Sequence, residues 1–120
     1  MPHKKIVTLL LAALLIAVSA FAQDYKSLLG KWNMTSETDQ DPVKWTLVLK
    51  EVDGKLAAFL ATSEQEQPAK NFTFVDGVIK FQAPYNGEDY DIELKPAGDT
   101  IAGSWSGNGD SGKTTGTRAQ

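Results

Sequence analysis

The chain has 120 residues, of which 15 are acidic and 12 basic, and it contains no cysteine and a single histidine, His3. The net charge of −3 argues against nucleic acid or an anionic membrane surface as a partner. Without cysteine, and with no histidine beyond position 3, the chain offers no thiol nucleophile, no histidine-based triad and few soft metal ligands. We therefore expect no enzyme, no catalytic residues, no cofactor and no metal.

The first 22 residues are typical of a signal peptide. His3, Lys4 and Lys5 form a positive region, residues 6–18 form an apolar run, and Ala20-Phe21-Ala22 is a cleavage site before Gln23. The apolar run is shorter than the roughly 20 residues that a membrane span needs. We expect cleavage after Ala22, no membrane association of the product, and a secreted or periplasmic protein formed by residues 23–120.

The remaining chain predicts one all-β domain of eight short strands, because apolar and polar positions alternate along most of it. The alternation between residues 55 and 62 is ambiguous, since either Leu56 and Leu60 or Phe59 could face inward. The last strand is rich in glycine and threonine and is the weakest prediction. The expected strands are 31–35, 43–51, 55–62, 70–75, 78–83, 88–95, 100–105 and 112–119.

The connections between these strands alternate between long polar loops and tight turns. The tight ones are Asp53-Gly54, Asp76-Gly77 and Pro96-Ala97-Gly98, and the long ones are 36–42, 63–69, 84–87 and 106–111. In a meander, successive connections lie at opposite ends, so the long loops would surround one open end. Closure into a barrel removes exposed edges. We predict an eight-stranded antiparallel up-and-down β-barrel, and the alternative is a two-sheet Greek-key sandwich, which needs a longer crossover.

A short helical turn, a Gly-x-Trp motif and a single arginine on the last strand together suggest a family. Residues 24–29 can form a turn with Asp24 as N-cap, Gly30-Lys31-Trp32 follows, and Arg118, the single arginine, lies on the last strand. This pattern resembles the calycin superfamily, which includes lipocalins, fatty-acid-binding proteins and avidins. The resemblance implies a small barrel in which Arg118 packs over Trp32 at the closed end.

The expected contact between Arg118 and Trp32 also has a physical basis. A guanidinium over an indole gains about 0.5–2 kcal/mol of cation–π attraction, and its remaining donors can bond carbonyl groups at the barrel floor. Gly30, Trp32 and Arg118 are therefore expected to maintain the fold. The chain is shorter than lipocalins and lacks their disulfides, and a shared fold does not identify a ligand.

Aromatic residues gather near the predicted open end. Aromatic side chains arranged around the inside of a barrel mouth suit a small apolar or aromatic ligand, with the Tyr90 hydroxyl and the indole N–H groups as polar contacts. We expect a non-enzymatic binding protein that holds this ligand in the mouth of the barrel. The alternative is a plugged core, because eight strands enclose little more than side chains. The expected ligand-binding residues are Trp45, Phe72, Phe81, Tyr90 and Trp105.

The rim of the predicted mouth is acidic. Eight acids stand against Lys44, Lys70 and Lys113, and this charge would either attract a cationic ligand or a basic protein, or simply keep the protein soluble. The alternative function is therefore a protein-interaction module, for example an inhibitor, acting through these loops or through residues 23–27. An outward apolar patch at Val48, Phe59 and Ala61 suggests a monomer or a weak oligomer. The acids are Glu37, Asp39, Asp41, Glu64, Glu66, Glu88, Asp89 and Asp110.

Overall fold

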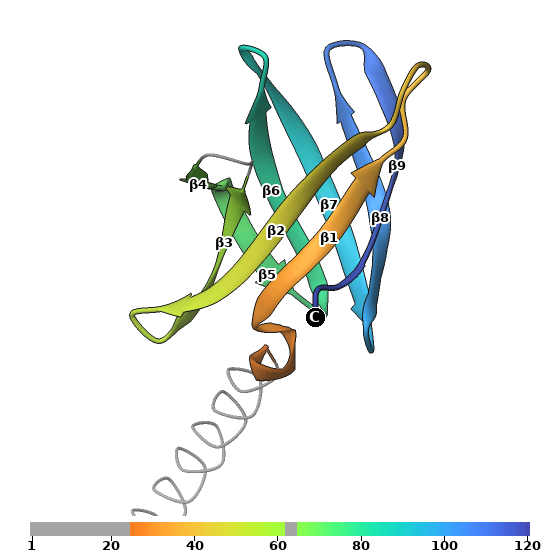
Figure 1. The fold of residues 1–120 in the computed structure, drawn as a ribbon. Coiled ribbons are helices and arrows are strands. Elements are labelled where there is room, and N and C mark those ends of the chain that lie inside the picture. Colours follow the sequence, from red (N-terminus) through yellow and green to blue (C-terminus); the bar gives the residue numbers. More distant parts are fainter. Residues whose placement is uncertain (1–24, 62–64) are drawn as a thin grey trace, which may run out of the picture.

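In the computed structural model, residues 25–61 and 65–120 are described, and they form an antiparallel β-barrel in meander order (Figure 1). Within these ranges one short 3-10 turn precedes nine strands, which form a single sheet in the order β4-β3-β2-β1-β9-β8-β7-β6-β5. No helix of the described residues is long and apolar enough to cross a membrane. The elements are η1 Lys26–Leu28, β1 Gly30–Ser36, β2 Val43–Val52, β3 Lys55–Ala61, β4 Glu66–Pro68, β5 Lys70–Val75, β6 Val78–Tyr85, β7 Glu88–Ala97, β8 Thr100–Gly107 and β9 Asp110–Arg118.

The first and last strands meet, which makes the sheet a barrel. β1 pairs with β9 from Trp32↔Arg118 to Ser36↔Thr114, while its other edge pairs with β2. All nine described strands belong to this one sheet, so a two-sheet sandwich is excluded. The prediction of an antiparallel up-and-down barrel is confirmed at this level.

The prediction of eight strands is wrong, because the segment before residue 70 also pairs. β4 lies beside β3, with Phe59 opposite Pro68 and Ala61 opposite Glu66, and the N–H of Ala69 donates to the carbonyl of Ala58 at 2.9 Å. Beyond that point the chain turns away and pairs with β6, with a register shift between Lys70 and Thr73. The barrel is nearly closed, with a seam between the first residues of β3 and β5.

A bulge-like register shift between Lys70 and Thr73 accompanies the change of partner from β3 to β6. Asn71 adopts a positive φ of 53°, a conformation that asparagine tolerates better than most residues. Bulges bend the strand that carries them and increase its twist. One continuous stretch from Glu66 to Val75 therefore serves two neighbours in turn, β3 first and β6 afterwards.

Two of the connections that were predicted to be long loops, 84–87 and 106–111, are tight turns in the structure. β6 and β8 run further than expected, so Asn86-Gly87 and Asn108-Gly109 close two-residue turns with φ of 51° and 53° at the asparagines. Asparagine reaches this left-handed conformation much as Asp53 and Asp76 do at the opposite end. Residues 37–42, between β1 and β2, remain the long connection in the described part of the mouth.

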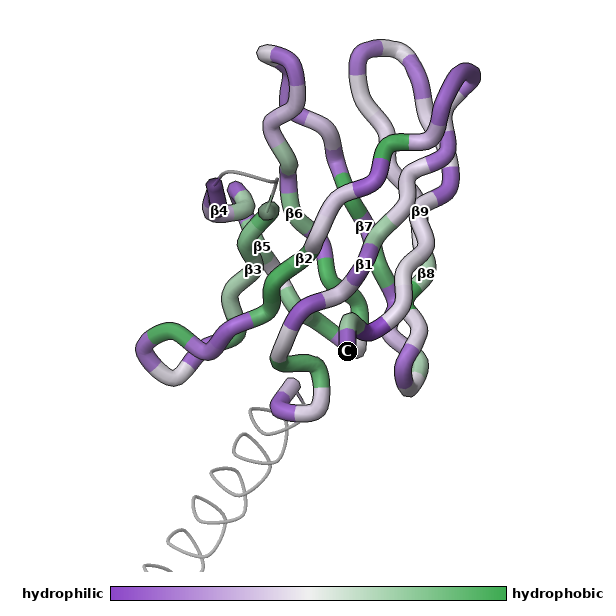
Figure 2. The backbone as a smooth tube through the Cα atoms, viewed as in Figure 1, coloured by the Kyte–Doolittle hydropathy of each residue, from purple (hydrophilic) through white to green (hydrophobic). Residues whose placement is uncertain are grey.

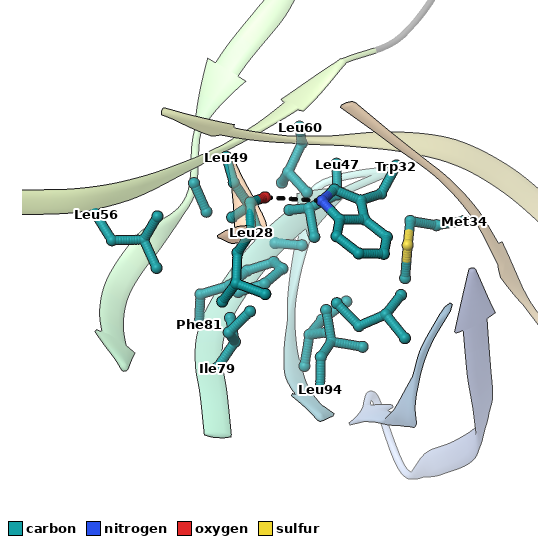
Figure 3. Packing of buried hydrophobic residues seen from close by; sticks show 14 of the residues in the cluster. Leu28, Trp32, Met34, Leu47, Leu49, Leu56, Leu60, Ile79, Phe81 and Leu94 are labelled. Atoms are coloured by element: carbon teal, nitrogen blue, oxygen red, sulfur yellow. Dashed lines mark hydrogen bonds between the residues drawn. The ribbon is translucent and has the colours of Figure 1, made fainter. Parts of the chain in front are cut away.

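The floor of the barrel is closed by the segment before β1. Tyr25 and Leu28 are buried, and the Trp32 indole N–H donates to the carbonyl of Leu28 at 3.0 Å (Figure 3). The predicted turn is present in shortened form, as the 3-10 turn η1 (Lys26–Leu28). The proposed N-cap Asp24, the signal peptide and its cleavage site lie outside the described residues.

Arg118 holds this closing segment against the end of β9. Its guanidinium lies 4.4 Å from the centroid of the Trp32 ring, as the sequence predicts. Nη2 donates to the carbonyl of Ser27 at 2.6 Å and Nη1 to that of Leu29 at 3.3 Å, while Nε pairs with Asp99 at 3.1 Å. The arginine therefore satisfies carbonyl groups of the η1 segment and covers the indole at the same time.

The inward side chains form one continuous apolar core. In β3 the buried residues are Leu56, Ala58 and Leu60, which settles the ambiguous alternation. Outward Val48 is also buried, and the Lys50 ammonium lies 4.8 Å over the neighbouring Phe59 ring. Hydrophilic residues dominate the hairpins at the top of the view, opposite η1 (Figure 2).

Candidate functional site

A cavity of about 220 Å³ opens at the end of the barrel opposite η1. Its walls come from the end of β1, the start of β2, the end of β3, β4, and the upper parts of β6, β7 and β8. Apolar and aromatic side chains predominate, and Lys44 alone is charged among the described residues that line it. Below the cavity the barrel is filled, because Met34, Leu47 and Leu94 are at most 1% exposed.

Three of the five predicted ligand-binding residues line this cavity. Trp45 comes from β2, Tyr90 from β7 and Trp105 from β8. Phe81 and Phe72 do not line it. Phe81 is 3% exposed with its ring 6.5 Å from that of Trp45, and Phe72 stacks on Phe81, also at 6.5 Å. These two phenylalanines extend the aromatic cluster into the core beneath the site.

The sequence analysis missed Tyr85, which also lines the cavity. Residues 84–87 were expected to form a loop, whereas β6 continues to Tyr85 and pairs it with Glu88. The ring of Tyr85 lies 6.3 Å from that of Tyr90 at an angle of 65°. The dipeptide Asn86-Gly87 was the signal that could have revealed it, because a two-residue turn there brings Tyr85 into the strand.

The indole N–H groups at the mouth already have partners within the protein. Trp45 Nε1 donates to Ser36 Oγ at 3.0 Å, and Trp105 Nε1 donates to the carbonyl of Glu37 at 2.8 Å. Ser36 in turn shares a hydrogen bond of 2.9 Å with buried Thr114. The expectation that both indoles offer N–H groups to a ligand therefore does not fit the structure.

These hydrogen bonds fix the two indole rings instead. The Trp105 ring is also 5.8 Å from the Tyr90 ring at an angle of 74°. The phenols of Tyr90 and Tyr85 have no hydrogen-bond partner among residues 25–61 and 65–120, so their hydroxyls are the polar groups that the aromatic wall can offer. The site combines rigid ring surfaces with a small number of uncharged polar groups, from Ser36, Thr38 and Gln67.

Acidic side chains surround the opening. Two of the predicted rim acids are engaged in ion pairs, Glu66 with Lys50 and Asp89 with Lys70 at 3.2 Å. Five others in the described ranges are exposed and form no ion pair, and two lysines of the rim, Lys44 and Lys113, are likewise unpaired. The remaining predicted acid, Glu64, lies outside the described residues. The five exposed acids are Glu37, Asp39, Asp41, Glu88 and Asp110.

Other parts of the described surface offer less for a ligand. No group of three or more histidine, cysteine, aspartate or glutamate side chains in residues 25–61 and 65–120 is arranged to hold a metal ion. Two larger depressions lie on the outside of the barrel, one over β9, β1 and β2 and one over β6, β7 and β8. Polar outward-facing residues such as Thr35, Thr115 and Gln82 line them.

Comparison with known proteins adds no assignment. A scan against models of protein families gives no match, and a search of curated proteins finds no significant relative. The resemblance to calycins therefore rests on Gly30, Trp32, Arg118 and the order of the strands, and function has to be argued from the cavity itself.

Proposed function

We propose that this chain is a binding protein that holds one small apolar or aromatic molecule in the mouth of its barrel. The observation that carries the proposal is the 220 Å³ cavity lined by Trp45, Tyr90 and Trp105 above a filled core. Ligand sites are typically concave, mostly apolar and largely preformed, with few polar groups. The cavity is smaller than the roughly 300–1,000 Å³ of sites for drug-sized molecules, which favours a ligand of one or two rings.

Filling the cavity tests this proposal without removing an aromatic residue. Ala83 lines the cavity and is 8% exposed, so Ala83→Phe would place a ring in the space meant for the ligand. Ala102 is exposed on the outside of β8, and Ala102→Phe is the matched control. The probe is 2-naphthol, detected by saturation-transfer NMR.

The wild type and Ala102→Phe are expected to give transfer from the protein to the probe, and Ala83→Phe is expected to give none. Circular dichroism and urea unfolding show whether both variants keep the fold. Equal transfer in a folded Ala83→Phe protein, or no transfer in the wild type across a set of one- and two-ring probes, would contradict the proposal.

We also propose that the protein acts outside the cytoplasm, as a calycin-like secreted or periplasmic domain. The support is the order of a basic region, an apolar run and Ala20-Phe21-Ala22 at the start of the chain. Expression of the full chain in a bacterium is expected to yield an exported product whose intact mass matches residues 23–120. A cytoplasmic product that retains residue 1 would contradict this part of the proposal.

A further inference from the structure

The aromatic rings at the mouth are set at steep angles to one another. Tyr85 and Tyr90 meet at 65° with centroids 6.3 Å apart, and Tyr90 and Trp105 meet at 74° with centroids 5.8 Å apart. Trp45 stands on β2, and β1, β9 and β8 separate this strand from β7 within the sheet. Rings set at steep angles around a hollow can contact a rounded group from several sides at once.

Neither indole can donate a hydrogen bond to such a group. Their N–H groups are held by Ser36 and by the Glu37 carbonyl, so both indoles line the cavity without a free donor. The negative face of an aromatic ring attracts cations, and this attraction is strongest where water is excluded. The same surface gives no such preference for a neutral group of equal shape.

The electrostatic surroundings also favour a cation. The exposed acids Glu37, Asp39, Asp41, Glu88 and Asp110 outnumber the unpaired lysines of the described rim, Lys44 and Lys113. A mouth bordered by one sign of charge raises the local concentration of ligands of the other sign. These acids stand on the rim and no carboxylate lines the described cavity, so the charge attracts the ligand without binding it directly.

Taken with the proposed function, on which this step rests, these features identify a ligand class. We propose that the cavity takes a quaternary ammonium group, with its methyl groups against Trp45, Tyr90 and Trp105. A primary ammonium carries three donors that each need an acceptor, whereas no carboxylate lines the described cavity and the hydroxyl of Ser36 is already bonded to Trp45 and Thr114. A quaternary ammonium has no N–H donor, so the aromatic wall satisfies it fully.

The test compares choline with its neutral carbon isostere, in which a tert-butyl group replaces the trimethylammonium group. Both are titrated by calorimetry into the exported protein, at low ionic strength and again with added sodium chloride. At low salt we expect choline to bind at least about tenfold more tightly than the carbon isostere. Because the rim charge is exposed and screened by salt, the preference is expected to shrink at high salt.

Variants separate the role of the rings from the shape of the cavity. Tyr90→Leu and Trp45→Leu keep an apolar wall and should weaken choline binding about tenfold, while the carbon isostere changes less. Phe72→Leu is the matched control, because Phe72 belongs to the aromatic cluster without lining the cavity. Lys44→Gln should strengthen choline binding about twofold to threefold, since it removes a positive charge from the lip.

The outcomes distinguish this inference from the proposed function. Equal binding of choline and the isostere would overturn the ammonium assignment and leave the apolar binding site in place. Failure of both compounds and of 2-naphthol would overturn the binding function itself. If Trp45→Leu does not fold, Tyr90→Leu and the salt dependence of the wild type decide the question.

Discussion

At the level of single residues, the glycines of the last two strands make room for the large rings of the core and the mouth. A Cβ at Gly112 would lie 2.6 Å from Trp105 Nε1, and one at Gly116 would lie 2.3 Å from Met34 Sδ. At Gly107 it would lie 2.7 Å from Tyr90 Cδ2. Gly112, one of the glycines that made the last strand look like a weak sheet former, thus makes room for Trp105, and Gly107 at the end of β8 makes room for Tyr90.

The substitution Gly112→Ala should therefore cost both stability and ligand binding. Its methyl group would lie 2.4 Å from the carbonyl oxygen of Glu37, the acceptor of the Trp105 N–H. Overpacking of this kind typically costs about 1–3 kcal/mol, and urea unfolding measures it. Thr115→Ala, on the exposed face of the same strand, should change stability by less than about 0.5 kcal/mol. Equal stability of the two variants would contradict this account of Gly112.

At the level of elements, the alternation of apolar and polar residues predicted the strands of the barrel well. The places where this alternation is interrupted were not predicted. Alternation placed Leu47, Leu49 and Leu94 inside correctly, because a side chain on a half-buried strand has only two directions to take. Strand ends were less predictable. Asn86 and Asn108 were assigned to loops, although each can take a positive φ and close a turn as tightly as Asp53 does.

The division of residues 66–75 into two strands could not be predicted from local pattern. Pro68 and the unusual φ of Asn71 interrupt the alternation, and which neighbour each half pairs with depends on where β3 and β6 lie. Pairing between strands distant in sequence is a property of the closed barrel. The sequence identifies Asn71 as a residue that tolerates a positive φ, but it does not show which strand the chain pairs with after that residue.

The η1 segment and the β2–β3 hairpin are joined by a contact that depends on pH. The Tyr25 hydroxyl donates to Glu51 and lies 3.0 Å from the Gly54 carbonyl oxygen, while Lys26 pairs with Glu51 at 3.5 Å. The hydrogen bond from Tyr25, supported by the charge of Lys26, lowers the pKa of Glu51 below its ordinary 4.5, although burial acts in the opposite direction. The same hydrogen bond raises the pKa of Tyr25 above 10.0.

A lowered carboxylate pKa stabilises the fold above the pKa of the unfolded chain, and this contribution disappears as the pH falls through the folded value. Tyr25→Phe should therefore destabilise the protein near neutral pH, and the difference from the wild type should shrink below about pH 4.5. Because the pKa of Tyr25 is raised, the contribution should also be lost as the pH rises above 10.0. Urea unfolding of both proteins over the pH range checks both limits. A difference independent of pH would contradict the role of the Tyr25–Glu51 hydrogen bond, because phenylalanine keeps the ring and the remaining loss would come from the hydrogen bond to the Gly54 carbonyl.

At the level of the whole molecule, the two ends of the barrel have different roles. One end is closed by Trp32, Arg118 and the η1 segment, and the other holds Trp45, Tyr90 and Trp105 around a cavity. The sequence predicted both groups, because inward alternation continues along every strand. It could not predict that Phe72 and Phe81 lie beneath the cavity, since depth along the axis depends on the register between strands.

The seam between β3 and β5 is the remaining structural difference between this molecule and a fully closed barrel. In the described ranges β5 pairs with β6 alone, and β3 pairs with β4 only from Phe59 to Ala61. β8, in contrast, pairs with β7 on one side and β9 on the other over most of its length. Val75, at the end of β5, is 62% exposed, so the end of this strand contributes little apolar surface to the core.

Native-state hydrogen exchange should therefore divide the barrel into unequal parts. Amides of β5 and of the first residues of β3 are expected to exchange through local opening, at a free energy below that of global unfolding, because each of these segments has a paired strand on one side only. Amides of β8 are expected to exchange only through global unfolding, as their strand has two paired neighbours. NMR-detected exchange at increasing urea concentration separates the two classes by their denaturant dependence. Equal protection of β5 and β8 would mean that the strands open together and that the seam is as stable as the rest of the sheet.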